Sequence, residues 1–481
     1  MSIAPVQRQS VISLFSTISL TIIGFLATIY FAHALGPAPL GAYFLFLAYF
    51  GIFNLIGDGG FGGAAIKRVS EGKDQNEFFS AYVFLRVLLI ALSIPVLLAA
   101  EPYLKDLSSS GMFPWLLLAL IVSVFASCVS MGVYGAGKVG IFQISTVVDT
   151  IFRVLLQVVA IVLGYNVAGL AGGFVAGMIA GSLVNFHYLE LRLTRFKTTH
   201  LISLFGFSFW IFLTTSGSLV FNYADTILIG YFMGNADVGI YRTAFQLTSV
   251  ATFTTLALHT VLYPKISNWH AEGNITAIET ALARAFTYSL ILAIPVCIGG
   301  WIFGERLLFF LYGASFASGA PAFYFLLLVQ IANVFMYLGT MSLNALDKPR
   351  EAFWVTALAS LANIVLNILL IPVLGITGAA IATLFTMSLN AGVALYLLSK
   401  LITVKMEHNP VKNILIASGV MGILMLIIRV LFPPSHVVIL FSVIAAGAVV
   451  YFFLLLKRDM GIRDELKGLC EGMGVPWPGW V

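Results

Sequence analysis

The chain has 481 residues, of which 60% are hydrophobic and 9% are charged, with a formal net charge of +5. A water-soluble protein of this size needs far more polar surface, so this composition excludes the soluble globular class. The basic excess does not indicate nucleic-acid binding either, because Lys and Arg occupy short segments between long apolar runs. We therefore expect an all-α integral membrane protein.

Apolar runs of about 20 residues, the length needed to cross a bilayer as a helix, recur along the whole chain. They predict about fourteen transmembrane helices. In chain order the predicted spans are Val11–His33, Leu40–Phe61, Phe79–Ala100, Phe113–Tyr134, Ile144–Leu163, Ala168–Leu189, Leu204–Tyr223, Tyr241–Leu262, Ala283–Phe303, Ala322–Ala345, Phe353–Val373, Gly378–Ser399, Asn413–Leu431 and Val437–Leu456. The segment Asp225–Phe232 either continues the seventh span or caps it.

Basic residues mark every second connection between these spans. The connections Ala34–Pro39 and Gly164–Val167 contain neither Lys nor Arg. The alternate connections are basic, at Lys67, Arg68, Lys73, Lys138, Arg192, Arg195, Lys197, Lys265, Lys348, Arg350, Lys400, Lys405 and Lys412. By the positive-inside rule, this alternation predicts a multi-pass protein of the cell (plasma or inner) membrane with both termini in the cytoplasm.

The chain also contains an internal duplication. Leu35–Tyr43 reads LGPAPLGAY and Met233–Tyr241 reads MGNADVGIY, so that Gly, Ala, Gly and Tyr recur at matching places. Later matches, such as Ile94–Val96 with Ile294–Val296, extend the similarity and predict that spans one to six repeat as spans seven to twelve. Each copy has an even number of spans, so the two copies share one orientation.

This repeat predicts the domain organisation. We expect an N-terminal lobe over residues 1–200, a C-terminal lobe over 201–402, two extra helices over 403–456 and a cytoplasmic tail over 457–481. Two parallel bundles leave a cleft between them, and transporters hold their substrate in such a cleft, which opens to one side and then to the other. Pro95 and Pro295 are either hinges for that motion or tolerated kinks.

These features resemble the multidrug/oligosaccharidyl-lipid/polysaccharide (MOP) flippase superfamily, and within it the polysaccharide transporter branch of O-antigen-type flippases. The similarity extends over essentially the whole chain. The motifs that carry it are Gly36–Tyr43, Asp58–Gly62, Asp225 with Gly230, Gly234, Gly239 and Tyr241, Asn344–Pro349, and Gly375–Ala380.

The resemblance implies two parallel six-helix lobes in a V-shaped pair, followed by two C-terminal helices. It also implies a transporter, not an enzyme, that moves a polyprenyl-phosphate or -diphosphate oligosaccharide from the inner to the outer leaflet. Coupling to a monovalent cation or a proton, and contact with glycan-assembly enzymes, are compatible with that function.

Ionisable residues inside membrane spans cost about 2.5–3.5 kcal/mol each, so they are candidates for function. Arg86 in the third span either clamps a substrate phosphate bidentately or extends towards the inner surface. Arg153 follows Asp149 by one helical turn, and it either forms a structural ion pair there or lines the cleft. Asn54 and Asn222 are further substrate-binding candidates, although such residues also join helices together.

Three charged residues are candidates for gating or coupling. Asp58 closes the second span beside glycines and either stabilises the inner gate or lies at the membrane interface. Asp225 ends one apolar run and Arg242 begins the next after a glycine-containing turn, so we predict that they pair near the outer surface. This pair serves either as a gate or as a fixed link between two helices.

No cofactor or metal is expected. The chain has no GxxxxGK loop for nucleotide phosphates, so ATP is not the direct energy source. His33, His187 and His259 have no metal-ligand spacing with another His, Cys or acid. Cys128, Cys297 and Cys470 are expected to be free thiols.

Two other functions remain open. A cation-coupled exporter of multidrug or other small molecules belongs to the same superfamily, but the two extra spans argue against it. A membrane glycan polymerase or ligase needs acid or base residues in a sizeable outer loop. The longest predicted outer loop, Glu101–Met112, carries only Glu101, Lys105 and Asp106.

Overall fold

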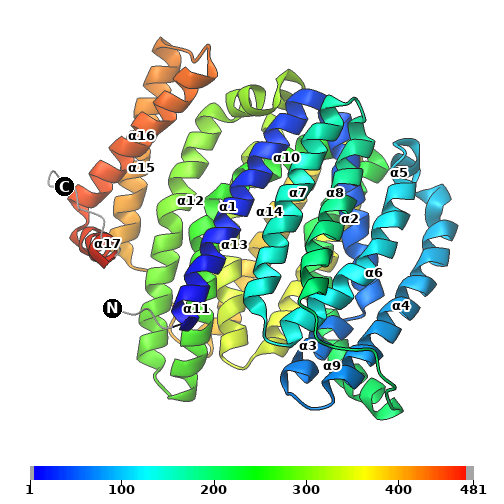
Figure 1. Ribbon diagram of the computed structural model, residues 1–481. Helices are drawn as coiled ribbons and strands as arrows, with labels where there is room; N and C mark the ends of the chain where they lie inside the picture. The colour runs from blue at the N-terminus through cyan, green and yellow to red at the C-terminus, as the bar shows by residue number, and fades with distance from the viewer. Residues whose placement is uncertain (1–4, 473–481) are drawn as a thin grey trace. The chain divides into compact units, whose positions relative to one another are not determined.

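The computed structural model describes residues 5–472, with side chains from residue 19 onward except for a few within 207–220 and 466–472. All regular elements in that range are helices (Figure 1). They are α1 (Pro5–Leu35), α2 (Pro37–Asp58), α3 (Phe61–Ser70), α4 (Gln75–Ala100), η1 (Glu101–Tyr103), α5 (Lys105–Ser109), α6 (Phe113–Gly135), α7 (Val139–Val162), α8 (Asn166–His187), α9 (Thr198–Phe232), α10 (Asn235–Thr248), η2 (Ser249–Thr252), α11 (Phe253–Ala271), α12 (Ile275–Tyr312), η3 (Ala314–Gly319), α13 (Ala320–Ala345), α14 (Pro349–Ser399), α15 (His408–Leu431), α16 (Val437–Arg458) and α17 (Met460–Gly472).

Eleven helical segments in the described part of the chain are long and apolar enough to cross a membrane. This confirms the prediction of an all-helical membrane protein. The count of about fourteen spans stays a prediction. One of the eleven segments, α14, runs from Pro349 to Ser399 and covers two of the predicted spans.

The helix α14 folds back on itself at Gly375. This residue has φ 61° and ψ −144°, a conformation that glycine adopts without a steric penalty. Asn363, which precedes Gly375, donates from its amide nitrogen to the Thr383 hydroxyl, which follows Gly375, at 3.4 Å. Twenty residues of straight helix would separate their backbones by about 30 Å. The two halves of α14 are therefore neighbouring antiparallel helices.

A row of glycines brings α8 close to α7. Gly169, Gly173, Gly177 and Gly181 are spaced four residues apart, so they share one face of α8. A Cβ added to Gly177 would lie 2.6 Å from the Asp149 carbonyl oxygen. Such rows of small residues let transmembrane helices pack at backbone distance.

The described contacts divide the chain into two compact units, Met1–Arg242 and Thr243–Val481. In the first unit, α3, α4, α6 and α9 share a core that includes Phe61, Phe79, Met131 and Leu204. The lobe boundary predicted at residues 200/201 stays a prediction.

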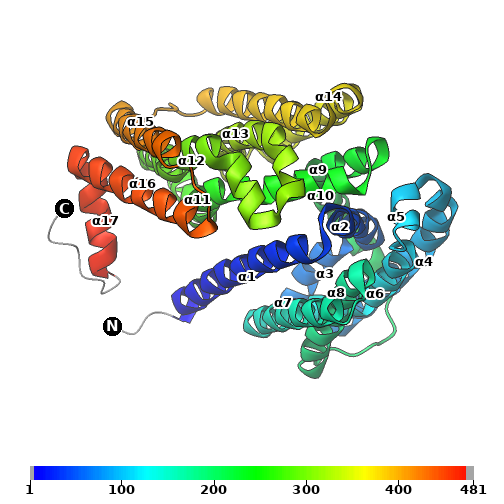
Figure 2. The same cartoon turned by 90° about the horizontal axis from the view of Figure 1, so that it is seen from above.

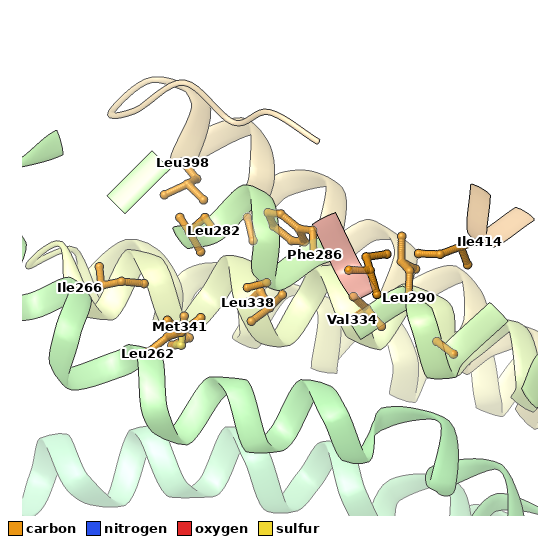
Figure 3. Close-up of a cluster of buried hydrophobic side chains, with 14 of the residues drawn as sticks. Leu262, Ile266, Leu282, Phe286, Leu290, Val334, Leu338, Met341, Leu398 and Ile414 are labelled. Carbon is orange, nitrogen blue, oxygen red and sulfur yellow. The ribbon is translucent and has the colours of Figure 1, made fainter. Parts of the chain in front are cut away.

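The second unit has its own apolar core (Figure 3). It joins α11, α12, α13, α14 and α15 through side chains that include Leu262, Phe286, Leu338, Leu398 and Ile414. The two helices predicted to follow the repeat, α15 and α16, pack on each other and on α12 (Figure 2). The Tyr451 hydroxyl fixes α16 by donating to the Ile291 carbonyl at 2.7 Å.

Three local predictions can be compared with the helices. Asp225–Phe232 continues the seventh predicted span, because α9 is unbroken to Phe232. The eighth predicted span, Tyr241–Leu262, lies within one candidate membrane-crossing segment, Asn235–Ala271, which the 3₁₀ segment η2 divides into α10 and α11. The charged tail after Lys457 contains the helix α17.

Candidate functional site

The two copies of the repeated motif contact each other at the beginnings of α2 and α10. A Cβ added to Gly41 would lie 1.7 Å from the Asn235 carbonyl oxygen and 2.7 Å from the Gly239 nitrogen. A Cβ added to Gly239 would lie 2.1 Å from the Pro37 carbonyl oxygen and 3.1 Å from the Gly41 nitrogen. Only glycine at both places allows the two backbones to approach this closely.

This contact is reciprocal. In the alignment of the copies, Pro37 corresponds to Asn235 and Gly41 corresponds to Gly239. Gly41 therefore contacts Gly239 and Asn235, and Gly239 contacts the corresponding residues Gly41 and Pro37. Such reciprocity is expected from a two-fold relation between the copies, and that relation stays a prediction.

The tyrosines that end each motif anchor it by hydrogen bonds. The Tyr43 hydroxyl accepts from Gln157 Nε2 at 2.9 Å, which links α2 to α7. The Tyr241 hydroxyl donates to Asp225 Oδ2 at 2.6 Å, which links α10 to α9. Tyr43 is 7% exposed and Tyr241 is 1% exposed, so both bonds are shielded from solvent.

The structure brings Asp225, Asn222 and Arg242 to this same region. Arg242 Nη1 donates to the Asn222 carbonyl at 3.3 Å, and its guanidinium lies 5.9 Å from the centre of the Phe44 ring. Asp225 is buried and accepts from Tyr241. A direct bond between Asp225 and Arg242 stays a prediction.

Arg86 and Asn54, both predicted to bind substrate, lie together inside the first unit. Arg86 is 1% exposed. Its Nη1 donates to the Asn54 carbonyl at 2.9 Å, and its Nη2 donates to the Asn54 side-chain oxygen and to Ser123 Oγ, the latter at 3.0 Å. These bonds connect α4 with α2 and α6. The guanidinium is thus engaged by protein acceptors, and the phosphate clamp stays a prediction.

Asp58 lies at the junction of α2 and α3, and it contacts α4, the helix that carries Arg86. Its Oδ1 accepts from the Tyr82 hydroxyl at 2.9 Å, and its Oδ2 accepts from the Gly62 amide at 3.2 Å. Gly59 and Gly60 turn the chain here with φ 57° and 76°. Asp58 therefore fixes the turn between two helices, while its predicted gating role stays a prediction.

Arg153 lies on α7 and keeps part of its surface accessible. Its Nη2 donates to Asp149 Oδ2 at 2.8 Å, and its guanidinium lies 5.1 Å from the centre of the Phe174 ring. The Arg153 side chain is 27% exposed. Asp149 Oδ1 and Arg153 Nε are buried without a hydrogen-bond partner. The ion pair predicted from the spacing is present, and it leaves unused hydrogen-bonding capacity.

The hydrogen bond from Tyr241 to Asp225 was not predicted, although Tyr241 ends the repeated motif together with Tyr43. Gln157 is a polar residue inside a predicted span, a class expected to join helices, and it joins α7 to α2. Elsewhere, the described residues contain no group of three His, Cys, Asp or Glu that could hold a metal ion. Cys128 and Cys297 are buried free thiols, and the Cys470 side chain lies outside the described part.

Two family models match the chain. The model described as polysaccharide biosynthesis protein matches residues 7–270, which is more than half of the chain. The model described as MatE matches residues 211–369.

Two curated relatives come from Haloferax volcanii. The probable low-salt glycan biosynthesis flippase Agl15 is 26% identical over 83% of this chain and 84% of its own length. The probable flippase AglR is 26% identical over 88% of this chain and 89% of its own length.

Solved transporters share the fold. The lipid II flippase MurJ, in an inward closed conformation, matches with a TM-score of 0.78 and 18% identity, covering 92% of this chain and 98% of MurJ. An inward-facing multidrug resistance MATE transporter of the MOP superfamily matches with a TM-score of 0.65 and 16% identity, covering 79% of this chain and 94% of the transporter.

Proposed function

The chain belongs to the polysaccharide biosynthesis protein family, and from this membership we propose that it is a flippase for a lipid-linked oligosaccharide or polysaccharide precursor. The observation that carries the proposal is its similarity, over more than four fifths of its length, to two proteins named as flippases. The resemblance to the MOP superfamily is confirmed by the family models and the shared fold. The proposed cargo is a polyprenyl-phosphate or -diphosphate glycolipid.

The proposed topology has fourteen spans in two parallel six-helix repeats, a V-shaped pair of lobes and two extra helices, with both termini in the cytoplasm. The fold-back of α14 supports it, since α14 then supplies the eleventh and twelfth spans. The basic connections support the orientation. Labelling from outside intact cells should modify a cysteine at Ala38 and not one at Arg195; the reverse pattern would overturn the orientation.

In this topology, the contact between Gly41 and Gly239 is the outer gate in its closed state. Glycine at both places lets the two backbones meet directly, because neither residue has a side chain that holds them apart. The reciprocal pairing supports the proposal, since alternating access requires corresponding elements of two repeats to separate and rejoin.

We place the head-group cation of the cleft at Arg153. Unlike Arg86, Arg153 retains 27% exposure while it is paired with Asp149. A phosphate can displace Asp149 from the guanidinium, because Arg binds phosphate and carboxylate with the same bidentate geometry. Asn222, whose carbonyl accepts from Arg242 at 3.3 Å, is proposed as a second head-group contact.

The flippase assay uses the purified full chain in proteoliposomes that contain a fluorescent polyprenyl-diphosphate oligosaccharide. A membrane-impermeant quencher should extinguish the protected inner-leaflet fraction faster with protein than without it. A cationic dye loaded into parallel vesicles tests the exporter function that the MatE match favours. Cation-driven dye movement without glycolipid movement would establish the exporter in place of the flippase.

The role of Arg153 has a matched control within the chain. Arg153→Gln should lower the flipping rate at least about ten-fold if it removes a charge-assisted bond to phosphate. Arg68→Gln removes a different one-turn ion pair, to Glu71 at 3.0 Å, and should leave the rate unchanged. Equal rates for the two variants would show that Arg153 has only a structural role.

A further inference from the structure

A cavity of about 490 Å³ opens between α11, the start of α12 and α17, all within the second unit. Its size falls within the range of small-ligand pockets, about 300–1,000 Å³. Leu258, Leu262 and Lys265 line it at intervals of four and three residues, so one face of α11 forms its wall. The cavity thus extends for about 10 Å, from a cation into an apolar groove.

The polar end of the cavity is suited to an anion. Lys265 and Arg284 both line it, together with Asn274 and Thr276 at the N-terminus of α12. That terminus contributes the positive end of a long helix dipole. Among the described residues, Lys265 takes part in none of the salt bridges.

The remaining walls are typical of a membrane interface. Trp269 and Tyr288 line the same cavity and are partly buried against the apolar core. Such amphipathic rings gather at the level of lipid head groups. A ligand that fits all of these walls has a compact anionic head and an apolar chain.

The helix α17 contributes Glu465 to the lining of this cavity, where it pairs with Arg284. Glu465 Oε1 lies 3.1 Å from Arg284 Nη1, and the two side chains are 40% and 52% exposed. The same pair also lines a neighbouring cavity of about 620 Å³, where Glu407 and Asp459 add two carboxylates. The first cavity adds Lys265 instead, so it is the better site of the two for an anion.

We propose that this cavity binds the phosphate head group of an anionic membrane lipid, with Lys265 and Arg284 as its cations and Glu465 as a competing internal anion. The head group replaces the Glu465 carboxylate on Arg284, and the acyl chain follows Leu262 and Leu258 along α11. Binding releases α17 from Arg284. This site goes beyond the proposed function and does not depend on it, because it lies on one unit and is read out without transport.

The test measures binding of dihexanoyl phosphatidic acid to the purified full chain in a neutral detergent. Dihexanoyl phosphatidylcholine and inorganic phosphate serve as competing probes. Lys265→Gln and Arg284→Gln should each weaken binding about five-fold, the effect of one basic residue near an anionic lipid surface. Glu465→Gln should tighten binding, because it removes the competing carboxylate.

Arg350→Gln is the matched control, since Arg350 is exposed and begins a different helix, α14. It should bind phosphatidic acid as the parent protein does. Melting temperatures measured without ligand identify any variant that is misfolded. A gain in affinity in Glu465→Gln cannot result from misfolding. The proposal is overturned if inorganic phosphate or phosphatidylcholine competes equally well, if the two cation variants match Arg350→Gln, or if Glu465→Gln binds no more tightly.

Discussion

Gly41 and Gly239 occupy the same place in two copies of one motif, and their backbones touch. An added Cβ on Gly41 would lie 2.7 Å from the Gly239 nitrogen, and one on Gly239 would lie 3.1 Å from the Gly41 nitrogen. A methyl group on either residue must push α2 and α10 apart. Replacing either glycine by alanine therefore tests the proposed gate.

Gly41→Ala and Gly239→Ala should each destabilise the closed contact by about 1–3 kcal/mol, the usual cost of overpacking. A shift of about 1.4 kcal/mol changes the closed-to-open ratio ten-fold. Labelling of a cysteine at Ala236 by a membrane-impermeant maleimide should therefore become faster. Gly24→Ala is the control, because nothing lies within 4 Å of its added Cβ. Unchanged labelling in both gate variants would contradict the proposed gate.

Tyr241→Phe should destabilise the protein more than Tyr43→Phe. The first substitution removes a bond to a buried carboxylate, worth about 1.5–3 kcal/mol, whereas the second removes a neutral bond, worth about 0.5–1.5 kcal/mol. The two tyrosines are corresponding residues of the repeat, so each serves as the control for the other. Denaturant unfolding in mixed micelles measures the difference. Asp225→Asn should reduce the effect of Tyr241→Phe, because the charge that the hydroxyl satisfies is then gone.

Arg86→Gln should lower the free energy of unfolding by about 3 kcal/mol, because it leaves Asn54 and Ser123 without their charged donor. Arg86→Lys should recover only part of this loss, since one ammonium group lacks the planar fork that reaches two helices. Thermal unfolding in detergent measures both variants. A variant that unfolds like the parent but no longer flips glycolipid would instead support the phosphate clamp predicted from the sequence.

Asp106 on α5 gives a prediction about pH. Partial burial raises the pKa of its carboxyl above the ordinary value of 3.8. A raised pKa in the folded state means that the neutral acid favours folding, and this contribution is lost as pH rises through the folded pKa. Asp106→Asn should therefore raise the melting temperature at pH 7, and the gain should shrink as pH falls towards 3.8. A gain that grows on acidification would contradict this sign.

Much of the fold could be predicted because membrane spans follow from composition and length. The runs of apolar residues located the helices, and the repeated motif identified the two segments that meet at Gly41 and Gly239. The η2 interruption could not be predicted, because Ser249–Thr252 is no more polar than many residues inside true spans. The 3₁₀ segment differs from the flanking α-helices in backbone conformation, which hydropathy does not reveal.

The site was harder to predict because a charged residue inside a membrane span can either bind other protein groups or contact a substrate. Arg86 and Arg153 each lie inside an apolar predicted span, and both were predicted to bind substrate. Burial separates them: Arg86 is 1% exposed, whereas the Arg153 side chain is 27% exposed. The difference depends on Asn54 and Ser123 from other helices, and no local pattern places them beside Arg86.

The fold-back at Gly375 has a consequence for how the chain enters the membrane during synthesis. The first half of α14 carries Asn363 and Asn367, whose amides would face hydrocarbon if that half were inserted alone, at a cost of several kcal/mol per unsatisfied group. Thr383 and Thr386 in the second half lie 3.4 and 3.3 Å from the Asn363 amide nitrogen. We therefore expect both halves to enter the lipid together, as one helical hairpin. A stop codon or a long insertion at Gly375 should then lower the amount of protein that accumulates in the membrane.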